Sequence, residues 1–353
     1  MKKRLLCITP GFGRTGAPLA LLNLLSILSQ HDIYDIYVMA YGDGELLHNY
    51  SDLIGGDHIE ILNGLNPTLE FRYKLQNNYD VIFLNTSAVC TFSNYFQNTD
   101  IPVFWWIHEA PEIIRESFPS FINPHLLSPN FHLLAPSKGA AELFSTYYSY
   151  KDICVLPVPV TKSKSIMPEL PFSLPANRII FFIPAAYTYV KGQDILLTAI
   201  ESLPDEYKQK SFFIFCGYTL EKQKDYKKGI FNLASHIDNI LMLEDQPLEI
   251  VYSIMNKSHC IVAPSRIDTI PLTIVEGLMF SKLILVSSQA GISSYITDCI
   301  NGFIFQNQSE LTKRLLLIIE DYPSLCNIAA KGHEVYNSFF SPQAVNDYIL
   351  KIL

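Results

Sequence analysis

The sequence predicts an α/β protein with two doubly wound, parallel-sheet domains, and three observations lead to this prediction. The chain has 353 residues, which is long enough for two ordinary domains. Short apolar runs alternate with helix-like stretches from end to end, and most of these runs are continuously apolar, as in strands that helices cover on both faces. A proline-rich stretch near the middle separates two such series.

The apolar runs give the expected strands of each half. The first half should have strands near 4–9, 33–40, 58–62, 80–85, 102–107 and 131–135, and the second near 178–184, 211–216, 239–243, 259–263, 283–287 and 302–305. Five prolines between residues 155 and 177 favour an extended linker over a packed element.

The expected organisation follows from these strands and prolines. It comprises a first Rossmann-like domain over 1–158, a linker over 159–176, a second domain over 177–340, and a C-terminal amphipathic helix over 341–353. The pattern does not fix where that last helix packs. Two domains of this kind are expected to face one another across a cleft at the carboxyl ends of their strands.

Composition limits the classes of function. Apolar residues make up 49% and charged residues 17%, which supports large cores and excludes disorder, and a net charge of −8 disfavours nucleic-acid binding. No apolar run approaches the roughly 20 residues that cross a bilayer. Seven cysteines without C-x-x-C spacing favour free thiols in a reducing compartment. We therefore expect a cytoplasmic protein.

Four lysines between residues 222 and 228 raise an alternative location. Such a cluster could touch anionic lipid and hold the protein peripherally at the inner face of a membrane. A solvated helix face accounts for it equally well and is the preferred interpretation.

Two carboxylates flank a strand-to-helix junction in the second half. Asp268 and Glu276 stand eight positions apart, on either side of the junction between the strand near 259–263 and the helix expected over 272–280. A helix start presents free N–H groups and partial positive charge, which suit phosphate. Carboxylates would repel a bare phosphate but could bind hydroxyls attached to it. A nucleotide-sugar, with hydroxyls on both sides of a diphosphate, fits this arrangement.

A glycine loop follows the first strand. Gly11, Gly13 and Gly16 match the G-x-G-x-x-G dinucleotide fingerprint and open a helix. The acids after the second strand, Asp43 and Glu45, come late and in a glycine-rich turn, so an intact NAD site is not expected. The loop therefore either contacts a phosphate or sugar, or needs glycine for backbone reasons alone.

A polar pair ends the strand near 102–107. His108 and Glu109 should lie at the carboxyl edge of the sheet, where His108 could hydrogen-bond a substrate hydroxyl or titrate near neutral pH. Taken alone, a structural histidine is the better interpretation. The other eight histidines lack metal-ligand spacing, so no metal site is expected.

Two cations lie near the second half's candidate site. Lys191 follows the first strand of that half at a helix start, where the helix dipole disfavours a cation, so a diphosphate contact would explain its presence. Arg266 lies one loop away by topology and is a second candidate for binding an anion.

Together these segments resemble the family 4 retaining glycosyltransferases, which have the GT-B fold. From Lys191 to Phe303 the chain has, in order, K-G-x-D, then P-S-x-x-D-x7-E where the family has P-S-x-x-E-x7-E, a glycine turn at Gly291, and N-G-F. The resemblance covers nearly the whole chain. It implies transfer of a sugar, with hexosyl transfer expected, from a nucleotide diphosphate-sugar to an acceptor hydroxyl with retention at the anomeric carbon.

The resemblance also implies roles for individual residues of the second half. Lys191 would contact the donor diphosphate, Glu276 the ribose hydroxyls, and Asp268 the hydroxyls of the donor sugar. Backbone N–H groups near Ile270 and Leu272 would lie beside that sugar.

In the first half, the resemblance places Gly13 and Gly16 in the loop across the cleft and His108 near the transferred sugar. It further implies a metal-independent reaction with no cofactor besides the nucleotide-sugar. The acceptor would be a glycan, lipid-linked or protein acceptor in bacterial polysaccharide, glycolipid or glycoprotein glycan assembly.

Three departures from the family pattern keep other functions open. Asp268 is one methylene shorter than the usual Glu, Ala186 stands where the family has Arg, and Pro271 replaces a glycine between the two acids. The main alternative is a weak or inactive GT-B-like partner subunit that binds a glycan or another transferase. A sugar-nucleotide epimerase and a dinucleotide oxidoreductase are further alternatives.

Overall fold

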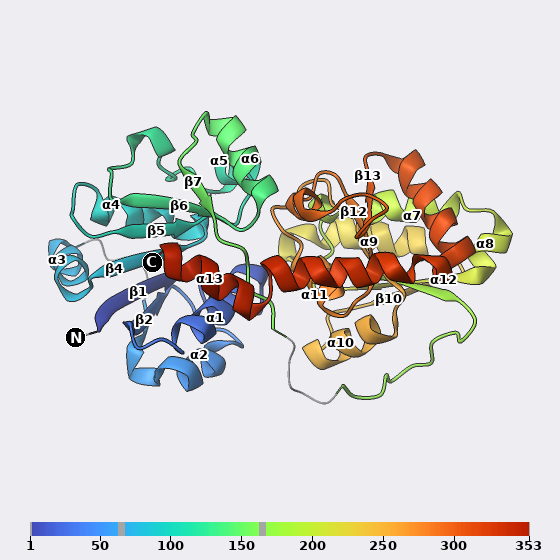
Figure 1. Ribbon diagram of the computed structural model, residues 1–353, viewed down its shortest axis with the longest axis horizontal. Coiled ribbons are helices and arrows are strands. Elements are labelled where there is room, and N and C mark those ends of the chain that lie inside the picture. Colours follow the sequence, from blue (N-terminus) through green and yellow to red (C-terminus); the bar gives the residue numbers. More distant parts are fainter. Residues whose placement is uncertain (1, 63–67, 162–166, 353) are drawn as a thin grey trace. The chain divides into compact units, whose positions relative to one another are not determined.

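The protein divides into two compact units. A computed structural model describes residues 2–62, 68–161 and 167–352. The first unit comprises Met1–Thr161 with Ser341–Leu353, and the second comprises Lys162–Phe340. In each, helices cover both faces of a parallel β-sheet (Figure 1), which confirms the predicted fold class. Residues 162–166 of the predicted linker lie outside the described residues.

The first unit is built on a seven-stranded parallel sheet with the strand order β3-β2-β1-β4-β5-β6-β7. Six of its strands were predicted, and the short edge strand β7 was not. Its strands are β1 (Lys3–Thr9), β2 (Tyr34–Ala40), β3 (Ile59–Ile61), β4 (Val81–Asn85), β5 (Val103–Trp106), β6 (Phe131–Ala135) and β7 (Ile153–Val155).

Helices of the first unit pack on both faces of this sheet, and the α-helices of this unit include the C-terminal one. They are α1 (Gly16–Leu28), α2 (Leu47–Ile54), α3 (Leu69–Asn78), α4 (Ser93–Phe96), α5 (Pro111–Ser117), α6 (Lys138–Tyr148) and α13 (Pro342–Ile352). Short 3-10 segments are η1 (Gly56–His58), η2 (Ser87–Phe92) and η3 (Pro124–Leu126).

The C-terminal helix α13 packs beside α1 within the first unit. Val345 and Ile349 are fully buried, as the amphipathic pattern requires, and His31 Nε2 lies 2.5 Å from Asn346 Oδ1. The chain therefore returns to the first unit after completing the second, a placement that the sequence pattern alone left open.

The second unit has a six-stranded parallel sheet with the order β10-β9-β8-β11-β12-β13. All six strands were predicted, with ends within one residue of the expected ones. They are β8 (Ile179–Pro184), β9 (Ser211–Cys216), β10 (Ile240–Leu243), β11 (Cys260–Ala263), β12 (Leu283–Ser287) and β13 (Phe303–Phe305).

Helices of the second unit also cover both faces of its sheet. They are α7 (Gln193–Glu201), α8 (Asp205–Lys210), α9 (Lys224–Ala234), α10 (Leu248–Lys257), α11 (Leu272–Met279) and α12 (Gln308–Phe339), with 3-10 segments η4 (Tyr189–Lys191), η5 (Glu221–Gln223) and η6 (Gly291–Tyr295). The long helix α12 is kinked at Asp321 (φ −135°, ψ 40°), two residues before Pro323, whose ring cannot continue a regular helix.

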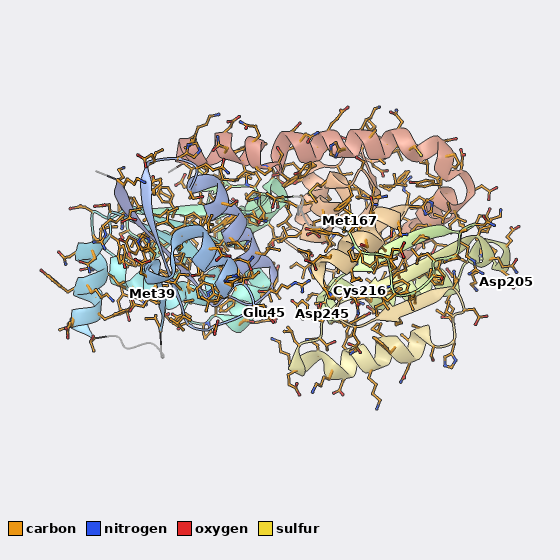
Figure 2. The ribbon with its side chains drawn as sticks, turned by 90° about the horizontal axis from the view of Figure 1, so that it is seen from below. Met39, Glu45, Met167, Asp205, Cys216 and Asp245 are labelled. Carbon is orange, nitrogen blue, oxygen red and sulfur yellow. The ribbon has the colours of Figure 1, made fainter. Side chains whose placement is uncertain are left out.

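Burial on both faces of the sheet explains why a strand such as β8 has a continuous apolar run in the sequence. In β8, Phe181 and Ile183 face the cluster formed by α7, α9 and α12, while Ile180 and Phe182 are also buried. Figure 2 shows the difference between the interior and the surface of the second unit. Cys216, at the end of β9, lies inside the unit, and Asp205, at the start of α8, lies on its outside. Both faces of β8 are thus covered, as in the central strands of a parallel sheet.

Residues 156–160, at the predicted boundary between the first domain and the linker, form an extended segment that is packed. Leu156, Val158 and Val160 are buried in an extended segment. Trp106 Nε1 donates to the Leu156 carbonyl at 3.0 Å. Further along the chain, Ser253 Oγ donates to the Pro168 carbonyl at 2.8 Å. Proline density excludes regular structure here, but alternating apolar residues still allow an extended chain to pack.

Both sheets reverse their strand order at one place, and this marks where a ligand should bind. The reversal lies between β1 and β4 in the first unit and between β8 and β11 in the second. In open α/β sheets, ligands bind outside the carboxyl ends of the strands at such a switch point. The loops that follow β8 and β11 are therefore the first place to look in the second unit.

Candidate functional site

The loops after β8 and β11 touch each other closely. Gly192 has a left-handed φ of +68°, and a Cβ there would lie 2.0 Å from the Pro264 carbonyl oxygen. The backbone N–H of Arg266 donates to the Val190 carbonyl at 2.8 Å. Only glycine permits this conformation and this approach together. The contact brings the segment that carries Lys191 against the segment that carries Asp268.

Lys191 and Asp268 form an ion pair at this junction. Lys191 Nζ lies 2.6 Å from Asp268 Oδ2, and Ser265 Oγ lies 3.4 Å from the same oxygen. The Asp268 side chain is 8% exposed and that of Lys191 28%, so the pair is partly withdrawn from water. The two residues predicted to bind the diphosphate and the sugar are thus direct neighbours.

The glycine turn predicted after β12 also reaches Asp268. The Gly291 N–H donates to the Asp268 carbonyl at 2.7 Å, and Asp268 pairs with Ala290 as an isolated bridge. Backbone bonds from this neighbouring loop hold Asp268 in place, so its carboxylate projects from a fixed position.

Helix α11 begins four residues after Asp268. Pro271 occupies its N-cap position, no side chain of the described residues caps it, and its first turn carries no acidic residue. Ile270 is buried just before the helix and Leu272 is its first residue. An uncapped helix start leaves backbone N–H groups for an anion or a polar ligand.

Glu276 lies inside α11 and is 6% exposed. Tyr252 on α10 donates its hydroxyl to Glu276 Oε1 at 3.0 Å. This contact orients a carboxylate that would otherwise be costly to bury. Tyr252 could not be identified from the sequence, because no local motif links it to Glu276, which lies 24 positions further along the chain.

Arg266 is engaged within the protein rather than presented as an open anion site. Its guanidinium forms two hydrogen bonds to Asp194, with Nη1 2.8 Å from Oδ1 and Nη2 2.6 Å from Oδ2. Nη1 also donates to the Tyr189 carbonyl at 2.8 Å, and the guanidinium carbon lies 3.9 Å from the centroid of the Tyr189 ring.

The glycine loop of the first unit rests on the turn after β2. The Arg14 N–H donates to Glu45 Oε2 at 3.2 Å, and the Leu46 N–H to the Phe12 carbonyl at 2.8 Å. The glycine that packing requires is Gly44, since a Cβ there would lie 2.3 Å from the Phe12 carbonyl carbon.

Gly13 itself has no such structural need. Neither Gly13 nor Gly16 has a positive φ, and a Cβ on Gly13 would meet no atom of the described residues within 4 Å. Gly16 is the first residue of α1, and no side chain among the described residues caps the start of this helix. The open space above Gly13 suits close approach by a ligand more than a constraint of the turn.

His108 joins a buried network at the carboxyl ends of β1, β4 and β5. Its Nε2 lies 3.1 Å from Asn85 Oδ1, and Asn85 Nδ2 donates to Thr9 Oγ1 and to the Ala17 carbonyl, each at 3.1 Å. The His108 ring also lies 4.4 Å from the Trp106 ring. Next to it, Glu109 accepts a hydrogen bond from the Ser87 N–H at 2.9 Å.

The suggestion that His108 titrates near neutral pH is wrong. Burial lowers its pKa to about 3, because a charged imidazole cannot be solvated there. His108 is therefore neutral at physiological pH, and it can take part in hydrogen bonds but cannot supply a positive charge.

Other candidate features of the chain, namely a metal site and a membrane contact, find less support in the structure. In residues 2–62, 68–161 and 167–352, no cluster of three or more His, Cys, Asp or Glu is placed to hold a metal ion. None of the helices described there has the length and apolar character needed to cross a membrane. Within the lysine cluster, Lys224 pairs with Glu221 and Lys227 with Glu244, which favours the interpretation as a solvated face.

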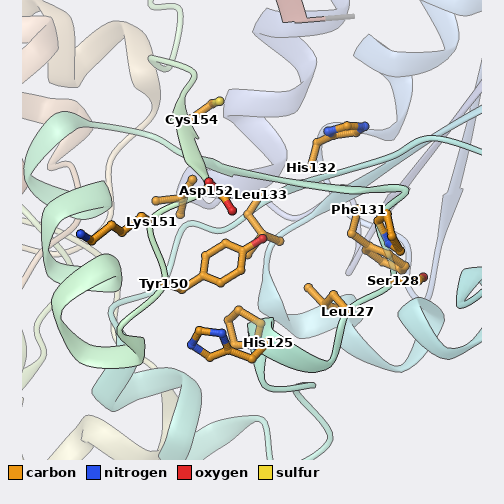
Figure 3. A pocket seen from close by; sticks show the side chains of 13 residues that line it. His125, Leu127, Ser128, Phe131, His132, Leu133, Tyr150, Lys151, Asp152 and Cys154 are labelled. Atoms are coloured by element: carbon orange, nitrogen blue, oxygen red, sulfur yellow. The ribbon is translucent and has the colours of Figure 1, made fainter.

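A pocket of about 610 Å³ lies elsewhere in the first unit. Its lining includes His125, Leu127, Ser128, Tyr150 and Asp152, which precede β6 and β7 (Figure 3). It therefore lies near the amino ends of these strands, at the opposite edge of the sheet from Asn85 and His108. The predicted site residues do not line it.

Comparison with known families places the match in the second unit. Residues 169–335 match the sequence profile of glycosyl transferases group 1, a span that includes Lys191, Asp268 and Glu276. An uncharacterized glycosyltransferase, MJ1178 of Methanocaldococcus jannaschii, is 26% identical over 157 residues. That match covers 44% of this chain and 42% of the relative, less than half of either.

Solved structures resemble the whole chain. Anabaena Alr3699/HepE, determined in complex with UDP and glucose, superposes with a TM-score of 0.78 at 16% identity over 99% of both chains. A glycosyltransferase from Rickettsia africae has a TM-score of 0.73 and 15% identity, and the match covers 99% of this chain and 97% of the Rickettsia chain. WaaG, a glycosyltransferase involved in lipopolysaccharide biosynthesis, has a TM-score of 0.66 and 12% identity, and the match covers 98% of this chain and 99% of WaaG. These likenesses identify the fold as GT-B.

The contact at Gly192 predicts a specific cost for adding a methyl group. Gly192→Ala should lower the free energy of unfolding by about 2 kcal/mol, because alanine is strained at a positive φ and its Cβ would overlap the Pro264 carbonyl. Urea denaturation measures this change. The control is Gly229→Ala in α9, where a Cβ meets nothing within 4 Å and helix propensity should add about 0.5–1 kcal/mol. Equal stability of the two variants would contradict the account.

The neutral state of His108 predicts a pH dependence of stability. Its folded pKa is about 3 against about 6.5 when unfolded, so its contribution is complete above pH 6.5 and is lost as the pH falls toward 3. Between pH 7.5 and 5.5, the wild-type protein should lose about 1 kcal/mol more unfolding free energy than His108→Gln. Urea titrations at both pH values test this, with the exposed His48→Gln as control; parallel losses in wild type and His108→Gln would refute it.

Proposed function

We propose that this protein is a retaining glycosyltransferase that moves a sugar from a nucleotide diphosphate-sugar to an acceptor hydroxyl. The observation that carries the proposal is the arrangement at the β8/β11 switch point, where Lys191 pairs with Asp268 just before α11 and Glu276 lies one turn inside that helix. The group 1 match spans this cluster, and HepE, which shares the fold, was determined with UDP-glucose.

The donor diphosphate would lie at the start of α11, with Lys191 as its cation. Lys191 Nζ is paired with Asp268 at 2.6 Å, and we propose that a diphosphate replaces Asp268 as the partner of Lys191. Asp268 is then released to accept hydrogen bonds from the sugar hydroxyls. This exchange keeps both charges satisfied, because each loses one partner and gains another.

Glu276 would bind the ribose hydroxyls from one turn inside α11. Its carboxylate is held by Tyr252 and needs no rearrangement to accept hydrogen bonds from a ribose. The residue at the position of the family's arginine, Ala186, offers no charge, so Lys191 and the helix start would neutralise most of the leaving diphosphate. This charge stabilisation would provide most of the catalysis without a metal ion.

The chemical step we propose is attack of the acceptor hydroxyl on the face that the leaving phosphate vacates. The C–O bond to the phosphate breaks, the acceptor oxygen bonds to the anomeric carbon, and a phosphate oxygen takes the acceptor proton. Asp268 and Glu276 bind hydroxyls in this scheme and serve as neither acid nor nucleophile. Neutral His108 and the loop at Gly13 would contact the sugar or the acceptor from the first unit.

The biological setting is proposed from the resemblance alone. We propose hexosyl transfer to a glycan, lipid-linked or protein acceptor in bacterial polysaccharide, glycolipid or glycoprotein glycan assembly, by a cytoplasmic protein that contacts the membrane at most peripherally. A specific observation, the absence of the usual arginine at Ala186, favours one second candidate. That candidate is a GT-B-like partner subunit that binds sugar nucleotide or glycan without turnover.

Lys191 is expected to be essential for transfer. A panel of UDP- and GDP-sugars is screened for nucleotide release, and the active donor is then used with Lys191→Ala. Turnover should fall on the order of 10²–10³-fold, the effect of losing one fixed donor to the developing charge. The control is Lys227→Ala, which removes a paired lysine of α9 and should leave turnover unchanged. Unchanged turnover in Lys191→Ala would exclude its role, and binding without release for every donor would favour the partner subunit.

The two carboxylates are expected to separate nucleotide from sugar recognition. Calorimetry should show that Glu276→Gln weakens binding of both the nucleotide and its sugar conjugate about tenfold or more, because a charge-assisted hydrogen bond to ribose is lost. Asp268→Asn should weaken binding of the sugar nucleotide only. The bare nucleotide should bind this variant equally well or more tightly, because Lys191 loses its competing partner. The reverse pattern would contradict the assignments.

A further inference from the structure

Asp194 and Arg266 form a clasp that ties together the two loops of the candidate site. The carboxylate and guanidinium make two parallel hydrogen bonds of 2.8 and 2.6 Å. A third residue, Tyr226 on α9, donates its hydroxyl to Asp194 Oδ1 at 2.9 Å. The side chains of Arg266 and Asp194 are 25% and 30% exposed, so the pair is screened by water less than a surface ion pair is.

The positions of the two residues give the clasp its significance. Asp194 is three residues after Lys191, in the first turn of α7, and Arg266 is two residues before Asp268. The clasp therefore spans the same pair of segments that the Lys191–Asp268 ion pair spans. Arg266 also binds the Tyr189 carbonyl and stacks on its ring, two residues before Lys191. One guanidinium thus holds the chain on both sides of the lysine.

The electrostatics of the clasp agree with its geometry. Burial alone would raise the pKa of Asp194, but hydrogen bonds from Arg266 and Tyr226 outweigh burial and hold it below its ordinary value. The hydrogen bonds to Asp194 raise the pKa of Arg266. Both groups are therefore charged at every physiological pH. A bidentate pair fixes both distance and angle, whereas the single contact of a lysine leaves its ammonium free to move.

We propose that Asp194 and Arg266 are positioning residues, which set the place of Lys191 relative to Asp268 and so act on the transfer step rather than on donor affinity. The proposal rests on the proposed function, in which Lys191 must meet the diphosphate while Asp268 meets the sugar. It also means that Arg266 does not replace the cation missing at Ala186. Its guanidinium faces a carboxylate, and moving it to a phosphate would leave the partly buried Asp194 without its charged partner.

The test combines kinetics with a spectroscopic probe of Lys191. Asp194→Asn keeps the shape of the side chain and removes its charge, and Arg266→Gln removes the guanidinium. These two variants, the double variant and the wild type form a double-mutant cycle. With the active donor, each single variant should lower kcat tenfold or more and change KM less than threefold. The kcat of the double variant should be at most threefold lower than that of either single variant, because the two residues act as one unit. Asp194→Glu, which keeps the charge, should retain more activity than Asp194→Asn.

The second readout does not require activity. Reductive ¹³C-methylation of the full chain gives one signal per lysine, and the signal of Lys191 is the one missing from Lys191→Ala. Its chemical shift and linewidth should change in Asp194→Asn and in Arg266→Gln. Glu244→Gln is the control, since it breaks the ion pair with Lys227 on the same unit and should leave the Lys191 signal and kcat unchanged.

Two results would overturn the proposal. One is a lowered melting temperature in Asp194→Asn with kcat and the Lys191 signal both unchanged, which would make the clasp purely structural. The other is a KM increase of tenfold or more with unchanged kcat, which would make Arg266 a donor ligand. If the wild-type protein turns over no nucleotide-sugar, the proposed function fails by itself, and the Lys191 signal still decides whether the clasp positions this lysine.

Discussion

The close approach of Gly192 to the Pro264 carbonyl is the constraint on which the candidate site depends. It lets the loops after β8 and β11 lie against each other and brings Lys191 within 2.6 Å of Asp268. The same loops are joined a second time by Asp194 and Arg266, and a third loop at Gly291 holds the Asp268 backbone. A glycine contact, ion pairs and a backbone hydrogen bond therefore all hold the segment between β11 and α11.

Much of this arrangement could be predicted from the sequence. Continuous apolar runs identify every strand of the described residues except β7, and the strand order of a doubly wound sheet then places the loops of Lys191 and Asp268 side by side at a switch point. The ion pair between Lys191 and Asp268 was not predicted, because topology brings the two loops together but does not fix which side chains meet. The spacing from Asp268 to Glu276 places the second carboxylate in a helix.

The remainder could not be predicted, for reasons that are physical. Strand β7 directly precedes prolines that suggested a linker, and one of its three residues, Cys154, is exposed, so its apolar run is interrupted. Tyr252 reaches Glu276, and Asp194 reaches Arg266, across contacts 24 and 72 residues apart in sequence, which only the folded chain reveals. The low pKa of His108 depends on burial among Asn85 and Trp106, whereas its residue type alone suggests titration near neutrality.

The central claim is that a donor diphosphate takes Lys191 away from Asp268. A crystal structure of the complex with a nucleotide-sugar that stabilises the protein tests this claim most directly. The account predicts a phosphate oxygen about 3 Å from Lys191 Nζ, with the sugar hydroxyls on Asp268 and the ribose on Glu276. A nucleotide bound away from the start of α11, with Lys191 still on Asp268, would contradict it.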